Sequence, residues 1–334
     1  MEQGERRLPE RIYASMFVNI RMEEPMTLDP QVAAYLASLP VAEPVTSLDE
    51  MRRQNTFSGI VSGGETIPLA QVHNRAIPGP AGEIPVRIYR PTPDNALLPV
   101  VLYFHGGGWV LGNLDTHDNI CRSLAKHTPC VVIAVDYRLA PEHKYPAALE
   151  DAEAALLWVN ANAQELAIDA SRIAVAGDSA GGNIAAALTL LARDRGYPSL
   201  AAQALVYPVT DYYTGDHDSY TTIKEGYGLT VQDMRWFWDQ YLSTPEEGEQ
   251  PYAAPLRAQN LGHLPPALVL VAEYDPLRDE GQKYAQRLQE AGVPTQFIYL
   301  KGLIHSFFRM NGVFSHALEH QQNVAAWLHS RFEE

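Results

Sequence analysis

Cysteine is scarce in this 334-residue sequence, which contains only Cys121 and Cys130. Two cysteines exclude a disulfide framework, and they exclude any metal site built from four thiolates. A single bridge between them is the alternative to two free thiols. We expect two buried thiols, the usual state of cysteine in a reducing compartment.

Long apolar runs are also missing. No stretch approaches the roughly 18 apolar residues that a membrane-spanning helix needs. The mixed-charge residues 1–7 lead into no apolar segment of the kind that a secretory signal contains. The sequence therefore predicts a soluble cytoplasmic protein with no membrane contact.

Positive charge is the third shortage. The chain has 25 lysines and arginines against 40 aspartates and glutamates, which gives a formal net charge of −15. A protein that binds nucleic acid needs a basic face to neutralise phosphates, so we expect no nucleic-acid partner. This charge balance suits a protein that acts on small neutral or cationic molecules.

Strand and helix patterns alternate through most of the chain. Short, apolar, β-branched runs are typical of strands buried on both faces, and a strand exposed on one face alternates with a period of two. Such patterns predict strands at residues 83–90, 100–104, 131–135, 173–176, 204–207, 267–271 and 296–299, and helices at 146–162, 179–195, 280–290 and 313–332. This order predicts an α/β fold with a mostly parallel central sheet flanked by helices.

Two regions fall outside this alternation. Helical spacing and start signals predict a helix over residues 8–21, a second from Pro30 to 39 after an Asp29 cap, and a third that begins with a Ser47–Glu50 capping box. An aromatic-rich insertion at 211–250 follows a predicted core strand. An ordinary helix packed on the sheet would explain it, but we favour part of a lid over a pocket.

A candidate nucleophile lies between a predicted strand and a predicted helix. Residues 177–181 read Gly-Asp-Ser-Ala-Gly and place Ser179 in this turn. A turn this sharp strains the backbone of the serine and requires small neighbours, while the helix N-terminus favours a developing anion. An incidental serine in a glycine-rich turn is the alternative, and the flanking strand and helix argue against it.

Residues 105–109, His-Gly-Gly-Gly-Trp, follow another predicted strand. Consecutive glycines leave their amides uncovered, as an oxyanion hole requires. A phosphate-binding loop is the alternative, but its Gly-Lys-Ser/Thr ending is missing. For His105 we favour a role in ordering the loop over a catalytic or metal-binding role.

A serine nucleophile needs a histidine base and a carboxylate that orients it, in the chain order Ser, Asp or Glu, His. Asp275 and His305 each follow a predicted core strand, so both should lie at the same edge of the sheet as Ser179. Asp211 and Asp279 are the alternative acids. We favour Asp275, because Pro276 fixes the turn after it and Asp279 is placed to cap the next helix. No metal-ligand spacing is present.

The motifs together resemble the bacterial hormone-sensitive-lipase family (family IV) of α/β-hydrolase esterases. They occur in family order at residues 105–109, 136–142 (Asp-Tyr-Arg-Leu-Ala-Pro-Glu), 177–182, 275–279 and 305–307. The resemblance covers nearly the whole chain. It implies an α/β-hydrolase fold with an eight-stranded, mostly parallel sheet and a helical cap. The cap would comprise residues 1–55 and part of 208–250, and the catalytic domain residues 56–334.

The resemblance also assigns roles to residues. It implies a catalytic triad of Ser179, Asp275 and His305, with Asp275 supported by the Gly-Asp-Ser-Ala-Gly form of the motif. The same resemblance implies an oxyanion hole made by the amides of Gly107, Gly108 and Ala180, and structural roles for Asp136, Arg138 and Glu142 in the loop that supports the glycine-rich turn.

The predicted function is that of a serine carboxylesterase that hydrolyses short- to medium-chain acyl esters through an acyl-enzyme on Ser179. The expected partner is a small-molecule ester, and no cofactor or metal is expected. A deacetylase or amidase acting on small acylated molecules shares this chemistry and stays open. A non-catalytic small-molecule receptor is disfavoured because the triad is complete. The sequence leaves open whether the protein is a monomer or a homodimer.

Overall fold

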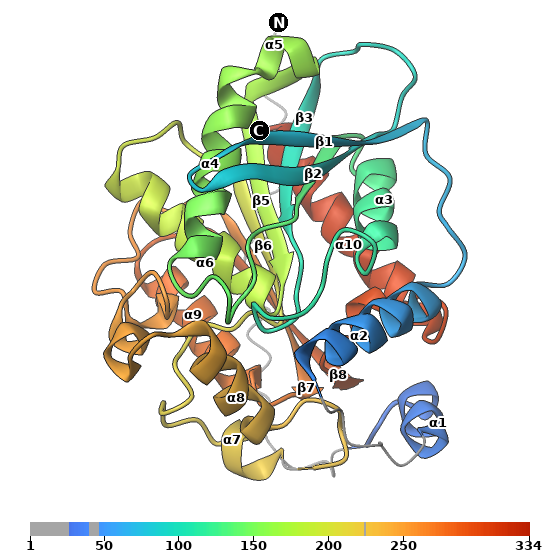
Figure 1. Ribbon diagram of the computed structural model, residues 1–334, viewed down its shortest axis with the longest axis vertical. Coiled ribbons are helices and arrows are strands. Elements are labelled where there is room, and N and C mark those ends of the chain that lie inside the picture. The colour runs from blue at the N-terminus through green and yellow to red at the C-terminus, as the bar shows by residue number, and fades with distance from the viewer. Residues whose placement is uncertain (1–26, 40–46, 224) are drawn as a thin grey trace, which may run out of the picture.

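An eight-stranded sheet forms the centre of the computed structural model, which describes residues 27–39, 47–223 and 225–334 (Figure 1). The strands are β1 (Gln71–Gly79), β2 (Gly82–Arg90), β3 (Leu98–Phe104), β4 (Val131–Val135), β5 (Ile168–Asp178), β6 (Ala202–Val206), β7 (Ala267–Tyr274) and β8 (Thr295–Ile304). Their order in the sheet is β1-β2-β4-β3-β5-β6-β7-β8. The pairs β1–β2 and β2–β4 are antiparallel, and all other neighbours are parallel. The predicted eight-stranded, mostly parallel sheet is confirmed.

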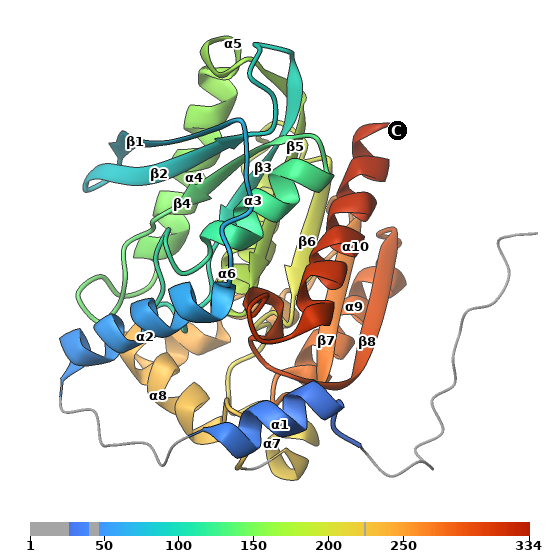
Figure 2. The same ribbon diagram turned by 90° about the vertical axis from the view of Figure 1, so that its right-hand side faces the viewer.

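Helices cover both faces of this sheet (Figure 2). One face carries α4 (Ala147–Ala161), α6 (Ala180–Asp194) and α9 (Arg278–Glu290), and the other carries α3 (Asp118–His127) and α10 (Ser315–Phe332). Successive side chains of a strand point to opposite faces. In β3, Val100, Leu102 and Phe104 enter the first core and Val101 and Tyr103 the second. Burial on both faces explains why the central strands read as continuous apolar runs.

The remaining helices are shorter or lie near one end of the sheet. They are α1 (Pro30–Ser38), α2 (Leu48–Gly63), α5 (Ala163–Leu166), α7 (Ser219–Thr222) and α8 (Val231–Tyr241), with 3₁₀ helices η1 (Pro245–Glu249), η2 (Pro255–Arg257) and η3 (Phe307–Arg309). Helices α1, α2, α7 and α8 gather at the end toward which the arrows of the parallel strands point (Figures 1 and 2). The carboxyl ends of parallel strands are where open α/β sheets bind ligands.

The N-terminal predictions had mixed outcomes. Asp29 caps α1 as expected, since its Oδ1 accepts from the amides of Gln31 and Val32. The capping box at the start of α2 was half right, because Ser47 Oγ accepts from the amide of Glu50 while the Glu50 carboxylate binds Arg53 and Gln54 instead. The helix predicted over residues 8–21 lies outside the described residues.

The predicted division of the chain into a cap and a catalytic domain stays a prediction. The boundary predicted after residue 55 falls inside α2. Both cysteines are buried and free, as expected. Within the described residues, no helix combines the length and apolar character needed to cross a bilayer.

Candidate active site

Ser179 occupies a strained turn between β5 and α6. Its φ of 55° and ψ of −121° lie outside the regions that residues with a side chain ordinarily adopt. The surrounding backbone fixes this conformation: the Ser179 amide donates to the carbonyl of Val206 at 2.9 Å, and its carbonyl accepts from the amides of Asn183 and Val209. Strain that neighbouring structure enforces in this way is characteristic of functional sites.

The glycines on either side of Ser179 are required by close backbone approaches. A Cβ on Gly177 would lie 2.3 Å from the carbonyl oxygen of Gly181, and a Cβ on Gly181 would lie 2.0 Å from that of Phe104. Real Cβ atoms do not approach oxygens this closely. The two glycines of the motif therefore allow β3, β5 and α6 to meet where the serine projects.

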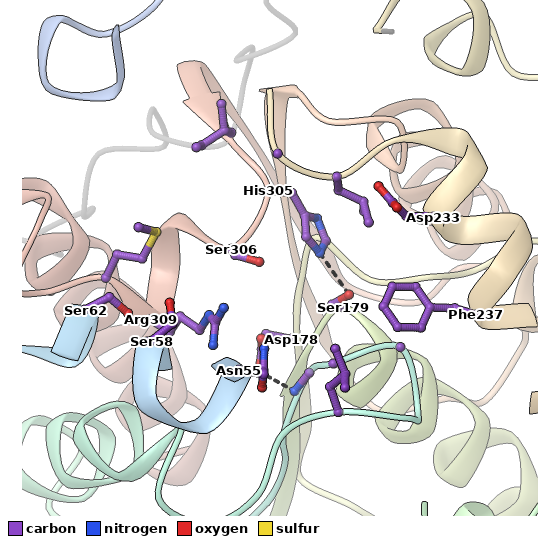
Figure 3. A pocket seen from close by; sticks show the side chains of 18 of the residues that line it. Asn55, Ser58, Ser62, Asp178, Ser179, Asp233, Phe237, His305, Ser306 and Arg309 are labelled. Carbon is purple, nitrogen blue, oxygen red and sulfur yellow. Dashed lines mark hydrogen bonds between the residues drawn. The ribbon is translucent and has the colours of Figure 1, made fainter. Parts of the chain in front are cut away.

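The structure brings Ser179, His305 and Asp275 into one hydrogen-bonded chain. His305 Nε2 lies 2.9 Å from Ser179 Oγ (Figure 3), and His305 Nδ1 lies 2.6 Å from Asp275 Oδ2. The other oxygen of Asp275 accepts from the amide of Leu277 at 2.9 Å. A carboxylate accepts hydrogen bonds only, so the proton belongs on Nδ1 and Nε2 is left to accept from the serine hydroxyl.

Three amides beside Ser179 have no acceptor. Among the described residues, the N–H groups of Gly107, Gly108 and Ala180 donate to no protein group. Gly107 and Gly108 have φ of 126° and 60°, and a Cβ on Gly108 would lie 2.2 Å from the ring of Phe237. Uncommitted amides next to a nucleophile can stabilise an oxyanion without reorganisation. The positions predicted from the family resemblance thus meet in one place.

His105 orders the glycine-rich turn and does not contact Ser179. Its Nδ1 bonds to the carbonyl of Gly106 at 2.9 Å, and its ring stacks on Tyr137 with centroids 4.3 Å apart. Tyr137 in turn donates its hydroxyl to the His105 carbonyl. Burial, together with the nearby His117, lowers the pKa of His105 to about 3, so the ring is neutral. These contacts agree with the ordering role that we favoured.

Asp178 connects the nucleophile turn to the glycine-rich turn, a role that sequence reasoning missed. Its Oδ1 accepts from the Tyr103 hydroxyl at 2.7 Å and from the Gly106 amide at 3.1 Å, and its Oδ2 lies 3.2 Å from His117 Nε2. Burial raises the pKa of Asp178, but His117 and Tyr103 outweigh this effect and hold that pKa at about 2. Asp178 belongs to the Gly-Asp-Ser-Ala-Gly motif, but its hydrogen-bond partners are distant in sequence. The motif alone therefore did not indicate its role.

The two alternative acids lie apart from His305. Asp211 pairs with His217 at 2.9 Å and with Arg257 at 2.6 Å. Asp279 accepts from the Ser219 amide and pairs with Arg278. The expectation that Asp279 caps the next helix was wrong, because α9 begins at Arg278 and places Asp279 in its first turn.

The loop at residues 136–142 is held by charged contacts. Arg138 binds Asp151 through its backbone amide and its guanidinium. Glu142 receives two hydrogen bonds of 2.7 Å from Arg52 of α2, which also donates to the Val110 carbonyl directly after the glycine-rich turn. Asp136 is half-buried, and burial raises its pKa to about 6.

A cavity of about 520 Å³ opens onto Ser179 and His305. Residues of α1, α2 and α8 and of the turns around Ser179 line it, and Figure 3 shows 18 of their side chains. The aromatic insertion contributes Trp236 and Phe237 from α8. The described residues contain no group of three histidines, cysteines or carboxylates placed to hold a metal ion.

Comparison with known proteins agrees with this geometry. A family model described as the alpha/beta hydrolase fold matches residues 101–309. Carboxylic ester hydrolase LipN of Mycobacterium tuberculosis is 45% identical over 256 residues, or 74% of this chain and 68% of LipN. Ethyl acetate hydrolase of Pseudomonas putida is 38% identical over 306 residues, or 88% and 96% of the two chains.

A solved structure extends the comparison to three dimensions. The hyperthermophilic esterase of the archaeon Pyrobaculum calidifontis matches with a TM-score of 0.86 and 42% identity, and the match covers 91% of this chain and 99% of that esterase. Identity and coverage at these levels indicate a shared fold. This chain belongs to the bacterial hormone-sensitive-lipase family of the α/β-hydrolase superfamily.

Proposed function

We propose that this protein hydrolyses short- to medium-chain acyl esters of small molecules through an acyl-enzyme on Ser179. The chain is a carboxylic ester hydrolase, in keeping with relatives that are themselves named as ester hydrolases. One observation carries the assignment of residues: the Ser179–His305–Asp275 chain ends beside three amides that have no acceptor. A nucleophile, its base and an anion site are the three parts that acyl transfer requires.

In the first half of the reaction, Ser179 Oγ attacks the acyl carbon as its proton moves to His305 Nε2. The imidazolium that forms donates from Nδ1 to Asp275, which is fully buried and held by the Leu277 amide. The negative charge that develops on the carbonyl oxygen is stabilised by the amides of Gly107, Gly108 and Ala180. His305 then returns the proton to the departing alcohol.

In the second half, water attacks the acyl carbon with His305 as the base. The same three amides stabilise the second tetrahedral intermediate, and Ser179 leaves as the restored hydroxyl. Asp178 and Tyr103 touch no reacting atom. They hold the Gly106 amide, and therefore the glycine-rich turn, in register with the nucleophile.

The size of the cavity supports the proposed chain length. A space of about 520 Å³ accommodates a small ester and has finite depth. Each acyl methylene that becomes buried gains about 0.8 kcal/mol, or about fourfold in kcat/KM, until the cavity is full. We therefore expect kcat/KM for 4-nitrophenyl esters to rise from acetyl to butyryl or hexanoyl and then to decline.

The substitution Ser179→Ala tests the proposal. It should lower the turnover of 4-nitrophenyl butyrate roughly 10⁵-fold, because no other group forms the acyl-enzyme. Mass spectrometry should find organophosphate bound to Ser179 in the wild type and unbound in the variant. Labelling that persists in the variant would refute the assignment, and faster turnover of a matched amide would move the activity to an amidase.

A further inference from the structure

Arg309 is a cation in the catalytic cavity that has no partner. It ends η3, four residues after His305, and extends into the cavity in Figure 3. Its side chain forms no ion pair and no hydrogen bond with any of the described residues, and its backbone amide donates to the Ser306 carbonyl. Its Nε atom is buried and unsatisfied. Arg309 is half-buried, and a guanidinium has five donors, so a buried Nε–H group without an acceptor requires an explanation.

One face of α2 adds further polar groups to the same cavity. Asn55, Ser58 and Ser62 lie at intervals of three and four residues, which places them on one side of a helix, and all three line the cavity. The Oδ1 atom of Asn55 is also buried without a partner. The close approach of α2 is visible at Gly59, where a Cβ would lie 3.1 Å from Arg309 Nη1.

The acidic residues that line the cavity form no ion pair with Arg309. Asp178 is one of them and is close enough for Arg309 to help lower its pKa, but its oxygens are hydrogen-bonded to Tyr103, Gly106 and His117. Asp233 is exposed on α8 and caps its own helix, with Oδ2 accepting from both the amide and the hydroxyl of Thr230. The positive charge of Arg309 therefore remains available to a ligand.

The cavity wall formed by α8 and the residues just before it is mainly apolar, unlike the polar face of α2. It presents Leu229, Met234, Trp236 and Phe237, and Phe237 lies directly over Gly108. A substrate whose ester group sits at Ser179 thus meets an apolar surface on one side and a cationic, hydrogen-bonding surface on the other. An ester with two apolar arms would leave the polar wall unsatisfied.

We propose that Arg309, with Asn55, Ser58 and Ser62, forms a subsite for a carboxylate carried by the ester substrate. This inference rests on the proposed role of Ser179, because that role fixes where the ester group lies. A guanidinium matches the geometry of a carboxylate, and amide and hydroxyl donors complete its coordination. The expected substrate class is a small ester with an apolar arm and a carboxylate arm. The net charge of −15 favoured neutral or cationic molecules, and the proposed subsite departs from that expectation because the preference is set locally in the cavity.

Two matched pairs of esters test the subsite with the full-length protein. Monoethyl glutarate against ethyl pentanoate places the carboxylate on the acyl arm, and 3-acetoxybenzoate against phenyl acetate places it on the alcohol arm. The measured quantity is the ratio of kcat/KM within each pair, at pH 7.5 and low salt. The wild type should favour the carboxylate ester in at least one pair.

Arg309→Gln should lower that ratio at least tenfold, chiefly through KM, and Arg309→Lys should restore part of it. Arg53→Gln is the matched control, because Arg53 is exposed on α2 and pairs with Glu50, so the ratio should stay within twofold. Asn55→Asp places a carboxylate on the same wall and should also lower the ratio, which covers the case in which Arg309→Gln does not fold.

Three outcomes would overturn the subsite. They are a wild type without preference in either pair, a ratio unchanged by Arg309→Gln and Asn55→Asp, and an equal loss on neutral and carboxylate esters. In each of these cases the neutral esters still report whether the enzyme hydrolyses esters. A wild type that hydrolyses none of the four esters and takes no organophosphate label would instead refute the proposed function.

Discussion

Two of the buried Asp–His pairs at the same edge of the sheet, Asp275–His305 and Asp211–His217, differ in what lies beyond the imidazole. Asp275 follows β7 and contacts His305 at 2.6 Å, while Asp211 follows β6 and contacts His217 at 2.9 Å. The second nitrogen of His305 faces the hydroxyl of Ser179. The second nitrogen of His217 is buried without a partner.

The carboxylates of the two pairs also have different surroundings. Among the described residues, Asp275 accepts only from the Leu277 amide and from its histidine. Asp211 accepts from Arg257 and from the Tyr212 amide in addition to His217, so a permanent cation neutralises it. An Asp–His pair at a strand end therefore does not by itself identify a catalytic site. The two pairs differ because the nucleophile Ser179 adjoins His305, whereas Arg257 neutralises Asp211.

The largest difference between the pairs should appear in turnover. Asp275→Asn should lower kcat about 10⁴-fold, by analogy with serine-protease triads, because the amide stabilises the wrong tautomer of His305. Asp211→Asn should lower kcat less than about tenfold, because its effect on the site is indirect. Initial rates on 4-nitrophenyl butyrate distinguish the two variants. Comparable losses in both would show that the pairs are not functionally distinct.

For the free energy of unfolding, we expect Asp211→Asn to have a larger effect than Asp275→Asn. Burial raises the pKa of Asp211, but hydrogen bonds from His217 and Arg257 outweigh it and lower that pKa. Asp211→Asn should therefore reduce the free energy of unfolding by about 2 kcal/mol at pH 7, since Arg257 keeps only Glu249 as an ion-pair partner. A depressed pKa contributes stability above the unfolded value of 3.8. Urea denaturation should show the difference between variant and wild type shrinking as the pH falls below about 4.

A third effect concerns Glu280, which lies behind the Asp211 pair. Its Oε1 accepts from the amides of Thr210 and Asp211, and its Oε2 accepts from the Tyr220 hydroxyl. Burial raises the pKa of Glu280 to about 8. A raised pKa means that the folded state binds the proton more tightly, so stability falls as the pH rises from about 4.5 through 8.

Glu280→Gln should remove this pH dependence. Its thermal midpoint should fall less than that of the wild type between pH 6 and pH 9, because glutamine has no proton to lose. Asp216→Asn, an exposed substitution near the same loop, serves as the control and should follow the wild type. A parallel decline in all three proteins would show that Glu280 does not govern stability in this range.

Sequence patterns predicted the catalytic half of the site better than the binding half. Ser179, Asp275 and His305 each follow a parallel strand, and motifs with fixed geometry contain them. Arg309 follows two buried phenylalanines and belongs to no motif that indicates a ligand. Its importance depends on the unpaired charge and on the polar face of α2, and both require three-dimensional neighbours.

In the fold, too, some elements were predicted from the sequence and others were not. Central strands were predicted because burial on both faces demands apolar runs, whereas the edge strand β1 has a single buried residue and was not assigned. Helix α3 was missed for a local reason: no side chain caps its first turn, and Cys121 and Ser123 fill part of its buried face. Elements that depend on packing against residues distant in sequence are difficult to predict from local sequence patterns.

The bridge made by Arg52 has a consequence for redesign of the enzyme. Arg52 joins α2 to the Val110 carbonyl and to Glu142, so the helix that forms one wall of the cavity is fastened to the turn that supplies two of the oxyanion amides. Any substitution that shifts α2 to admit a new substrate would also displace those amides. Attempts to broaden substrate range on this helix should therefore lower turnover. The same applies to α8, because its Phe237 lies over Gly108 and its Tyr241 stacks on Trp109.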